Sequence, residues 1–137
     1  MKNILLALTV LLMACGAGCS GPPPVSPQVN HMKPLSVLYG RFTAAKGRAP
    51  KNAEEFKKFI STAGADMLQQ FHVDADALLI SPVDGQPFVI AYGKIPPSKI
   101  IAYESQGEDG KRWMADDLGR VDQMKDEDLR SLIPNFK

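Results

Sequence analysis

Residues 78–92, LLISPVDGQPFVIAY, decide the fold because the spacing of apolar residues changes within them. Before this stretch, apolar residues recur at helical intervals. After it, they form short runs rich in β-branched and aromatic side chains. The dipeptide Asp84-Gly85 predicts a tight turn, and residues 88–92 predict a strand. Helices followed by short strands indicate an α+β domain.

Two amphipathic helices are predicted upstream of this stretch. The first has one apolar face with i, i+3, i+4, i+7 spacing, formed by Leu35, Leu38, Tyr39 and Phe42. Pro34, directly before this face, suits the first turn of a helix. A GRAP turn at 47–50 separates it from the second helix, in which Asn52 is the predicted N-cap and Glu55 completes a capping box. Residues 61–77 are less regular and predict a broken helix or a loop.

Further strands are predicted downstream of residue 92, at 100–103, 111–115 and 120–124. A short helix is predicted from residue 126 to residue 133, with acidic residues in its first turn and a proline after its end. A sheet of this size is marginal in water by itself. We therefore expect the N-terminal amphipathic helices to pack on a small antiparallel β-meander that is followed by a short C-terminal helix.

The N-terminus has the parts of a secretory signal peptide over residues 1–14. Lys2 precedes an uncharged apolar run at 4–14, which is shorter than the roughly 20 residues that span a bilayer. The following residues, Leu12-Met13-Ala14-Cys15, resemble the lipobox of bacterial lipoproteins, whose cysteine receives a diacylglyceryl group and becomes the first residue of the mature chain. Cys15 is therefore the predicted lipidation site, with Cys19 as the alternative.

Other interpretations of the two cysteines are less favourable. Two cysteines and two histidines provide few soft ligands for a closed tetrahedral metal site. A Cys15–Cys19 disulfide would close a very short loop and stabilise little. Attachment of more than one acyl chain would hold the protein on a membrane permanently. We expect an envelope protein that is anchored by lipid and faces the periplasm or the exterior.

Residues 15–33 are predicted to be a spacer that follows the lipidated cysteine, and residues 34–137 to be the folded domain. The spacer contains Pro22-Pro23-Pro24 and Pro27, which favour an extended semi-rigid chain. His31 is predicted to be exposed near its end.

The charge of the chain is balanced overall but divided along the sequence. Loss of Lys2 with the signal peptide leaves 15 basic and 15 acidic residues, so no field of one sign favours nucleic acid as a partner. Basic residues prevail over 33–58 and acidic residues over 104–128. The two halves either attract each other or form solvated faces; alternatively, the basic part faces an anionic envelope polymer or lipid head groups.

Several motifs together resemble a known family. The order of a helix, a G-R-x-P turn, a second helix, SPVDGQPFVIAY at 81–92 and ESQGEDG at 104–110 is similar to the globular part of the major pseudopilins of type II secretion. Those proteins assemble through a long N-terminal apolar helix, and this chain has a lipobox cysteine and a proline-rich spacer in its place. In layout it resembles small bacterial lipoproteins of unknown function. The resemblance implies a singly displayed domain, with a subunit of a type II secretion or pseudopilus-like apparatus as the alternative.

The same resemblance implies a calcium site. In pseudopilins an acidic loop near the sheet can hold calcium, and the corresponding candidate ligand here is Asp109, with Asp116 and Asp117 nearby in sequence. Calcium requires about six to eight oxygen ligands, and this chain lacks the glycine pair of the family loop. The other interpretation is an exposed acidic turn without a metal.

The sequence contains no recognisable catalytic motif. It has no G-x-S-x-G elbow, and its carboxylates are spread over predicted turns. His72, close to Asp74, has no nucleophile beside it in sequence. Trp113 is either a core residue under the helices or an exposed recognition residue. We predict a non-catalytic binding or scaffolding domain, with an envelope protein or polymer as partner; a hydrolase with an unrecognised site is a further alternative.

Overall fold

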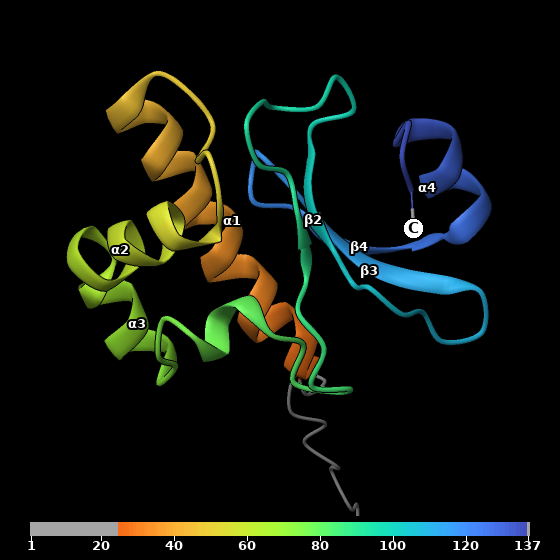
Figure 1. Cartoon of the computed structure of the whole chain (residues 1–137). Coiled ribbons are helices and arrows are strands. Elements are labelled where there is room, and N and C mark those ends of the chain that lie inside the picture. Colours follow the sequence, from red (N-terminus) through yellow and green to blue (C-terminus); the bar gives the residue numbers. More distant parts are fainter. Residues whose placement is uncertain (1–24, 137) are drawn as a thin grey trace, which may run out of the picture.

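The computed structural model describes residues 25–136, which form three layers (Figure 1). One side of a four-stranded antiparallel sheet is covered by helices α1, α2 and α3, and α4 lies on the other side. The elements in chain order are α1 (Pro27–Lys46), α2 (Ala53–Ala63), α3 (Ala65–Phe71), the single 3₁₀ turn η1 (Ala77–Leu79), β1 (Val89–Ile90), β2 (Ile100–Tyr103), β3 (Lys111–Asp116), β4 (Val121–Lys125) and α4 (Asp126–Leu132). The predicted α+β class is confirmed.

Helix α1 buries the predicted apolar face. Leu35, Leu38, Tyr39 and Phe42 are at most 1% exposed, and they pack against the sheet and the other helices. The helix ends at Gly47, whose positive φ of 68° is the left-handed conformation that glycine adopts at helix ends. The apolar spacing of this segment therefore predicted its buried face correctly.

The start of α1 differs from the prediction. The helix begins at Pro27, and Pro34 lies inside it, so residues 27–33 are not part of an extended spacer. An internal proline costs about 3 kcal/mol because it removes one backbone hydrogen bond and crowds the preceding turn. Burial of Met32, which is 0% exposed, offsets this cost through tertiary packing.

His31 also belongs to this first part of α1. Its Nδ1 lies 3.1 Å from the carbonyl oxygen of Ala77 and 3.2 Å from that of Ile80. A ring nitrogen facing two carbonyl oxygens must carry the proton and donate. His31, which was predicted to be exposed, thus joins α1 to the end of η1.

Helix α2 has the predicted cap. The Asn52 side chain accepts a hydrogen bond of 2.9 Å from the amide of Glu55. The reciprocal contact of Glu55 goes to the amide of Lys51, at 2.7 Å. Phe56 and Ile60 are fully buried, and Phe56 meets Tyr39 and Phe42 edge to face. The irregular segment after α2 contains the short helix α3.

The sheet has the strand order β1-β2-β3-β4, with every neighbouring pair antiparallel. β3 and β4 pair over five residues each, whereas β1 is only two residues long. The strand predicted over 88–92 is shorter because the amide of Phe88 donates to Leu79 O instead of joining the ladder. An irregularity between Ile100 and Ala102 shifts the register of β2 against β3.

Alternation along the strands gives the sheet two apolar faces. Ala102 and Ala115 belong to the core under α1, and Trp113 packs at its margin. On the opposite face, Tyr103 and Met114 contribute to a smaller core with Leu129 of α4. Phe136 closes this second core, where its ring stacks on Tyr103 at 5.4 Å. The sheet is therefore covered on both sides.

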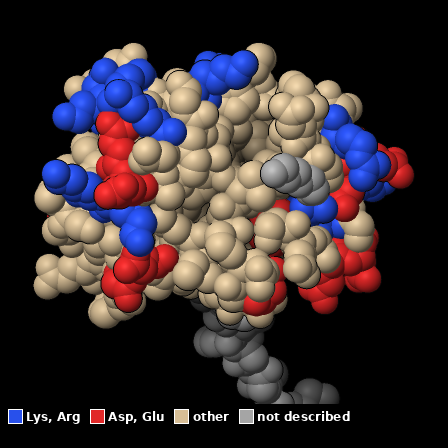
Figure 2. All heavy atoms as spheres, in the orientation of Figure 1, with Lys and Arg blue, Asp and Glu red and all other residues tan. Residues whose placement is uncertain are grey.

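Each of the six ion pairs within residues 25–136 lies either in the helical part of the chain or in the part after residue 98. Arg41 pairs with Asp66, Arg48 with Glu55, and Lys57 with Asp76, all within the helical part. In the acidic part, the pairs are Lys99–Asp117, Arg112–Asp126 and Arg120–Asp116. Figure 2 shows blue and red side chains interleaved on the helical side of the face in view.

Candidate functional site

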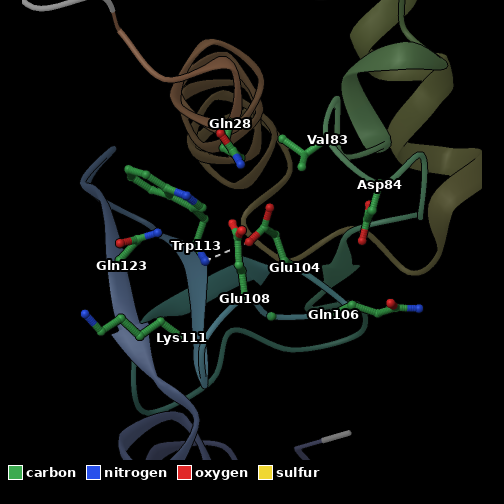
Figure 3. Close-up of a pocket in the computed structure, with 10 residues that line it drawn as sticks. Gln28, Val83, Asp84, Glu104, Gln106, Glu108, Lys111, Trp113 and Gln123 are labelled. Carbon is green, nitrogen blue, oxygen red and sulfur yellow. Dashed lines mark hydrogen bonds between the residues drawn. The ribbon is translucent and has the colours of Figure 1, made fainter.

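A cavity of about 190 Å³ opens where the N-terminal part of α1 meets the edge of the sheet (Figure 3). We call it the Glu104 pocket. It combines carboxylates, amides and one indole, from α1, from the 81–87 loop, from the 104–111 turn and from β3 and β4. Its lining residues are Gln28, Val83, Asp84, Glu104, Gln106, Gly107, Glu108, Lys111, Trp113 and Gln123.

Glu104 is placed in the pocket by the end of strand β2. Its amide donates to Trp113 O at 3.0 Å, while its side chain turns back and accepts from the Trp113 amide, also at 3.0 Å. The Glu104 carbonyl is contacted instead by the Arg112 guanidinium, at 3.3 Å. The carboxylate thus takes the position that a backbone carbonyl would have if the ladder continued.

The carboxylate of Glu104 is buried without a cation. The residue is only 7% exposed, and its carboxylate also accepts from the hydroxyl of Ser81, at 3.4 Å, and from the side chain of Gln28. All three donors are neutral groups. Burial raises the pKa of the Glu104 carboxyl above its ordinary value, the hydrogen bond from Trp113 N–H opposes this, and the charge of Asp84 raises the pKa further.

Two more carboxylates lie close to Glu104. In Figure 3 the side chain of Glu108 points toward that of Glu104, and Asp84 lies across the opening. Within residues 25–136, none of these three carboxylates takes part in an ion pair. Lys111 lines the rim, but Figure 3 shows its ammonium group directed away from the carboxylates. The pocket therefore carries concentrated negative charge.

Trp113 forms the apolar wall of the pocket. Its ring packs against the main core on one side and lines the cavity on the other, next to Gln28 and Gln123 in Figure 3. Trp113 therefore agrees in part with both predictions, a core residue and an exposed recognition residue, because it contributes to the core and borders a solvent-accessible site. Val83, which is 59% exposed, adds an apolar residue to the rim.

The structure separates the predicted calcium ligands. Asp109 lies in the turn before β3, whereas Asp116 ends that strand, which places them roughly 20 Å apart at about 3.3 Å per residue. Asp116 accepts hydrogen bonds from the amides of Leu118 and Arg120 and pairs with the Arg120 side chain. Asp117 pairs with Lys99. In the described part of the chain, no three His, Cys, Asp or Glu side chains are placed to share a metal ion.

The remaining predicted sites are not part of the pocket. Cys15 and Cys19 lie outside the described residues. His72 caps the C-terminal end of α3 with a positive φ of 53° and does not line the Glu104 pocket. His72 is therefore not brought together with the carboxylates of the Glu104 pocket.

Sequence reasoning missed Glu104, Glu108 and Gln28 as members of one site. Residues 28 and 104 are distant in the chain, and only the packing of α1 on the sheet brings them together. The sequence does contain one signal, since Glu104 directly follows the apolar strand 100–103 and lies nine residues before Trp113. An acidic residue at the end of a buried strand was a candidate for a partly buried carboxylate.

A second, larger cavity of about 420 Å³ lies between β1, β2 and the C-terminal segment. Its walls are mainly apolar and include Tyr92, Tyr103 and Ile133, with Lys94 as its only ionisable group besides the tyrosines. Burial raises the pKa of Tyr92 to about 12, so this hydroxyl is uncharged at neutral pH. The Glu104 pocket has the more specific combination of charged and aromatic groups.

Comparisons with protein family models, with curated proteins and with solved structures give no match to this chain. The likeness to pseudopilins consequently stays a prediction from the sequence motifs. None of the helices among residues 25–136 has the combined length and hydrophobicity that crossing a bilayer requires.

Proposed function

We propose that this protein is a lipid-anchored lipoprotein of the cell envelope whose folded domain acts by non-catalytic binding. The anchor is proposed from the lipobox-like sequence that ends at Cys15. The binding role is supported by one structural observation, the Glu104 pocket with its buried, cation-free carboxylate. Neither half of the proposal requires a catalytic group.

The position of the pocket is consistent with a role near the membrane. Gln28, which lines the pocket, is about 13 residues from Cys15. A chain spans at most about 3.6 Å per residue in any conformation, so the pocket would lie within about 47 Å of the lipid anchor. The described chain begins at the same end of the molecule as the pocket (Figures 1 and 3). A ligand at or near the membrane surface is therefore within reach.

The anchor is tested by intact mass and incorporation of labelled fatty acid into the wild type, Cys15→Ser and Cys19→Ser. We expect incorporation in the wild type and in Cys19→Ser, and its loss in Cys15→Ser. Loss in Cys19→Ser alone would assign the anchor to the alternative cysteine. An unlabelled wild-type protein that retains residues 1–14 would refute the anchor, and immunoblotting controls for expression.

A further inference from the structure

We infer that the Glu104 pocket binds a primary ammonium group on a short aliphatic carrier, such as the amine of a lipid head group or of a small free molecule. This inference rests on the binding role proposed above and names its ligand. It follows from four features of the pocket: the unpaired charge of Glu104, the adjacent carboxylates, the indole wall and the small volume.

Glu104 carries a charge that no cation within residues 25–136 neutralises through an ion pair. A buried carboxylate without a cation is unfavourable unless it is protonated or gains a positively charged partner. Glu104 is 7% exposed, and its hydrogen bonds come from three neutral donors, which are Trp113 N–H, Ser81 O–H and the side-chain amide of Gln28. A carboxylate has about four acceptor positions, so a position for a further donor remains. A cation that enters the cavity would supply the missing partner.

The set of surrounding groups selects an organic cation. Calcium needs about six to eight oxygen ligands, and no metal-binding group of three side chains occurs within residues 25–136. A primary ammonium group has three donors, and the carboxylates of Glu104 and Glu108 can accept from it. Both line the pocket, and Figure 3 shows both carboxylates directed toward its interior.

The aromatic wall distinguishes a primary from a quaternary ammonium group. Quaternary ammonium ions are recognised by cages of several aromatic rings, because they have no N–H donors. This pocket has a single indole, from Trp113, together with several oxygen acceptors. The indole and the exposed Val83 at the rim suit the methylene groups next to the nitrogen. The volume of about 190 Å³ admits a compact group and excludes a bulky one.

The test uses the fluorescence of Trp113, which is the only tryptophan of the chain and so reports on the pocket directly. The full-length protein, purified from cells in a nonionic detergent, is titrated with ethanolamine at constant ionic strength. Ethylene glycol is the neutral analogue and choline the quaternary one. We expect a saturable change with ethanolamine, and affinities at least about tenfold lower for both analogues, because a hydrogen bond to a charged group is lost.

Matched variants identify the groups responsible. Glu104→Gln keeps the size of the side chain and removes its charge, and we expect binding at least about tenfold weaker. Glu127→Gln, an exposed change on α4, should bind like the wild type. Thermal unfolding monitors folding; if Glu104→Gln does not fold, the exposed Glu108→Gln replaces it, with weaker binding again expected. No saturable change, equal binding of ethylene glycol, or unaltered affinity in the pocket variant would overturn the inference.

Two vesicle experiments distinguish the sources of the amine. The protein is reconstituted into vesicles of phosphatidylcholine, with or without phosphatidylethanolamine, and Trp113 emission is compared. A change with phosphatidylethanolamine assigns a lipid head group, whereas a response to free ethanolamine alone assigns a small amine. Absence of both overturns the inference. Fatty-acid labelling is independent of these results. A labelled protein that binds no amine would refute the inferred ligand but not the proposed anchor. An unlabelled protein that binds amine would refute the proposed anchor but not the inferred ligand.

Discussion

Glu55 and Glu104 are two glutamates whose carboxyl pKa values are shifted in opposite directions by their surroundings. Glu55 lies at the start of α2, where Arg48 contacts it with two nitrogens, at 2.6 and 3.0 Å. Its hydrogen bonds with Arg48 and Lys51 N–H lower the pKa of its carboxyl to about 2. Glu104 lies at the end of β2 without a cation, and burial raises its pKa.

The difference shows what each region is built to do. At the start of α2, the charge of Glu55 is neutralised by Arg48, and its carboxylate also accepts from Lys51 N–H. Both partners precede α2 in the chain, so the ion pair supports the turn between α1 and α2. At the pocket, the chain buries a carboxylate and leaves its charge unneutralised. Unfavourable features of this kind are concentrated at functional sites, where stability is traded for a ligand interaction.

The largest predicted difference between the two regions concerns their aromatic residues. Phe56→Ala should lower the free energy of unfolding by about 3–5 kcal/mol, because this ring is fully buried between Tyr39 and Phe42. Trp113→Ala should cost less, since part of the indole faces the pocket. Urea titrations of both variants measure this. If Trp113→Ala lowered the free energy of unfolding more than Phe56→Ala, the indole would belong to the core and not to a pocket wall.

A smaller effect is predicted at the cap of α2. Asn52→Ala removes the hydrogen bond from the side chain to Glu55 N–H and should lower stability by about 1 kcal/mol. Asn30→Ala, an exposed change within α1, is the matched control and should have little effect. Equal results for the two asparagines would mean that the cap does not stabilise α2. Thermal or chemical unfolding is suitable for the measurement.

Glu104 should make the stability of the folded domain depend on pH. A carboxyl whose folded-state pKa is raised contributes stability that is fully present below its unfolded pKa and is lost as pH rises through the folded value. Glu104→Gln should therefore gain stability relative to the wild type as pH rises above the ordinary glutamate pKa of 4.5. Melting temperatures across this range test it, with Glu127→Gln as control. A constant difference would contradict burial as the cause.

Glu55 should behave in the opposite way. Its pKa is lowered from 4.5 to about 2, so the stability it contributes is present above pH 4.5 and is lost as pH falls toward 2. Glu55→Gln should be less stable than the wild type at neutral pH, and the two should converge in acid. The effect should be the smallest of the four, because the pair is partly exposed and is screened by salt. Added salt that leaves the difference unchanged would contradict this.

The sequence predicted the parts of the fold that depend on local patterns. The apolar face of α1, the Asn52 cap, three of the strands and the helix after residue 125 were found from spacing and turn chemistry. The start of α1 was missed because local rules place a helix start at Pro34. Burial of Met32 against the rest of the fold instead extends the helix back to Pro27. The short β1 was overestimated because Phe88 pairs with a segment outside the meander.

The sequence alone determined the order of helices and strands and the lipobox-like segment, because each depends on residues that are neighbours in the chain. Only the tertiary structure decided that Glu104 meets Trp113, Glu108 and Gln28 in one cavity, and that Asp109 is kept away from Asp116. The physical reason is that a site is formed by segments distant in sequence. Their meeting depends on how α1 lies across the sheet and on the strand register, which no local pattern specifies.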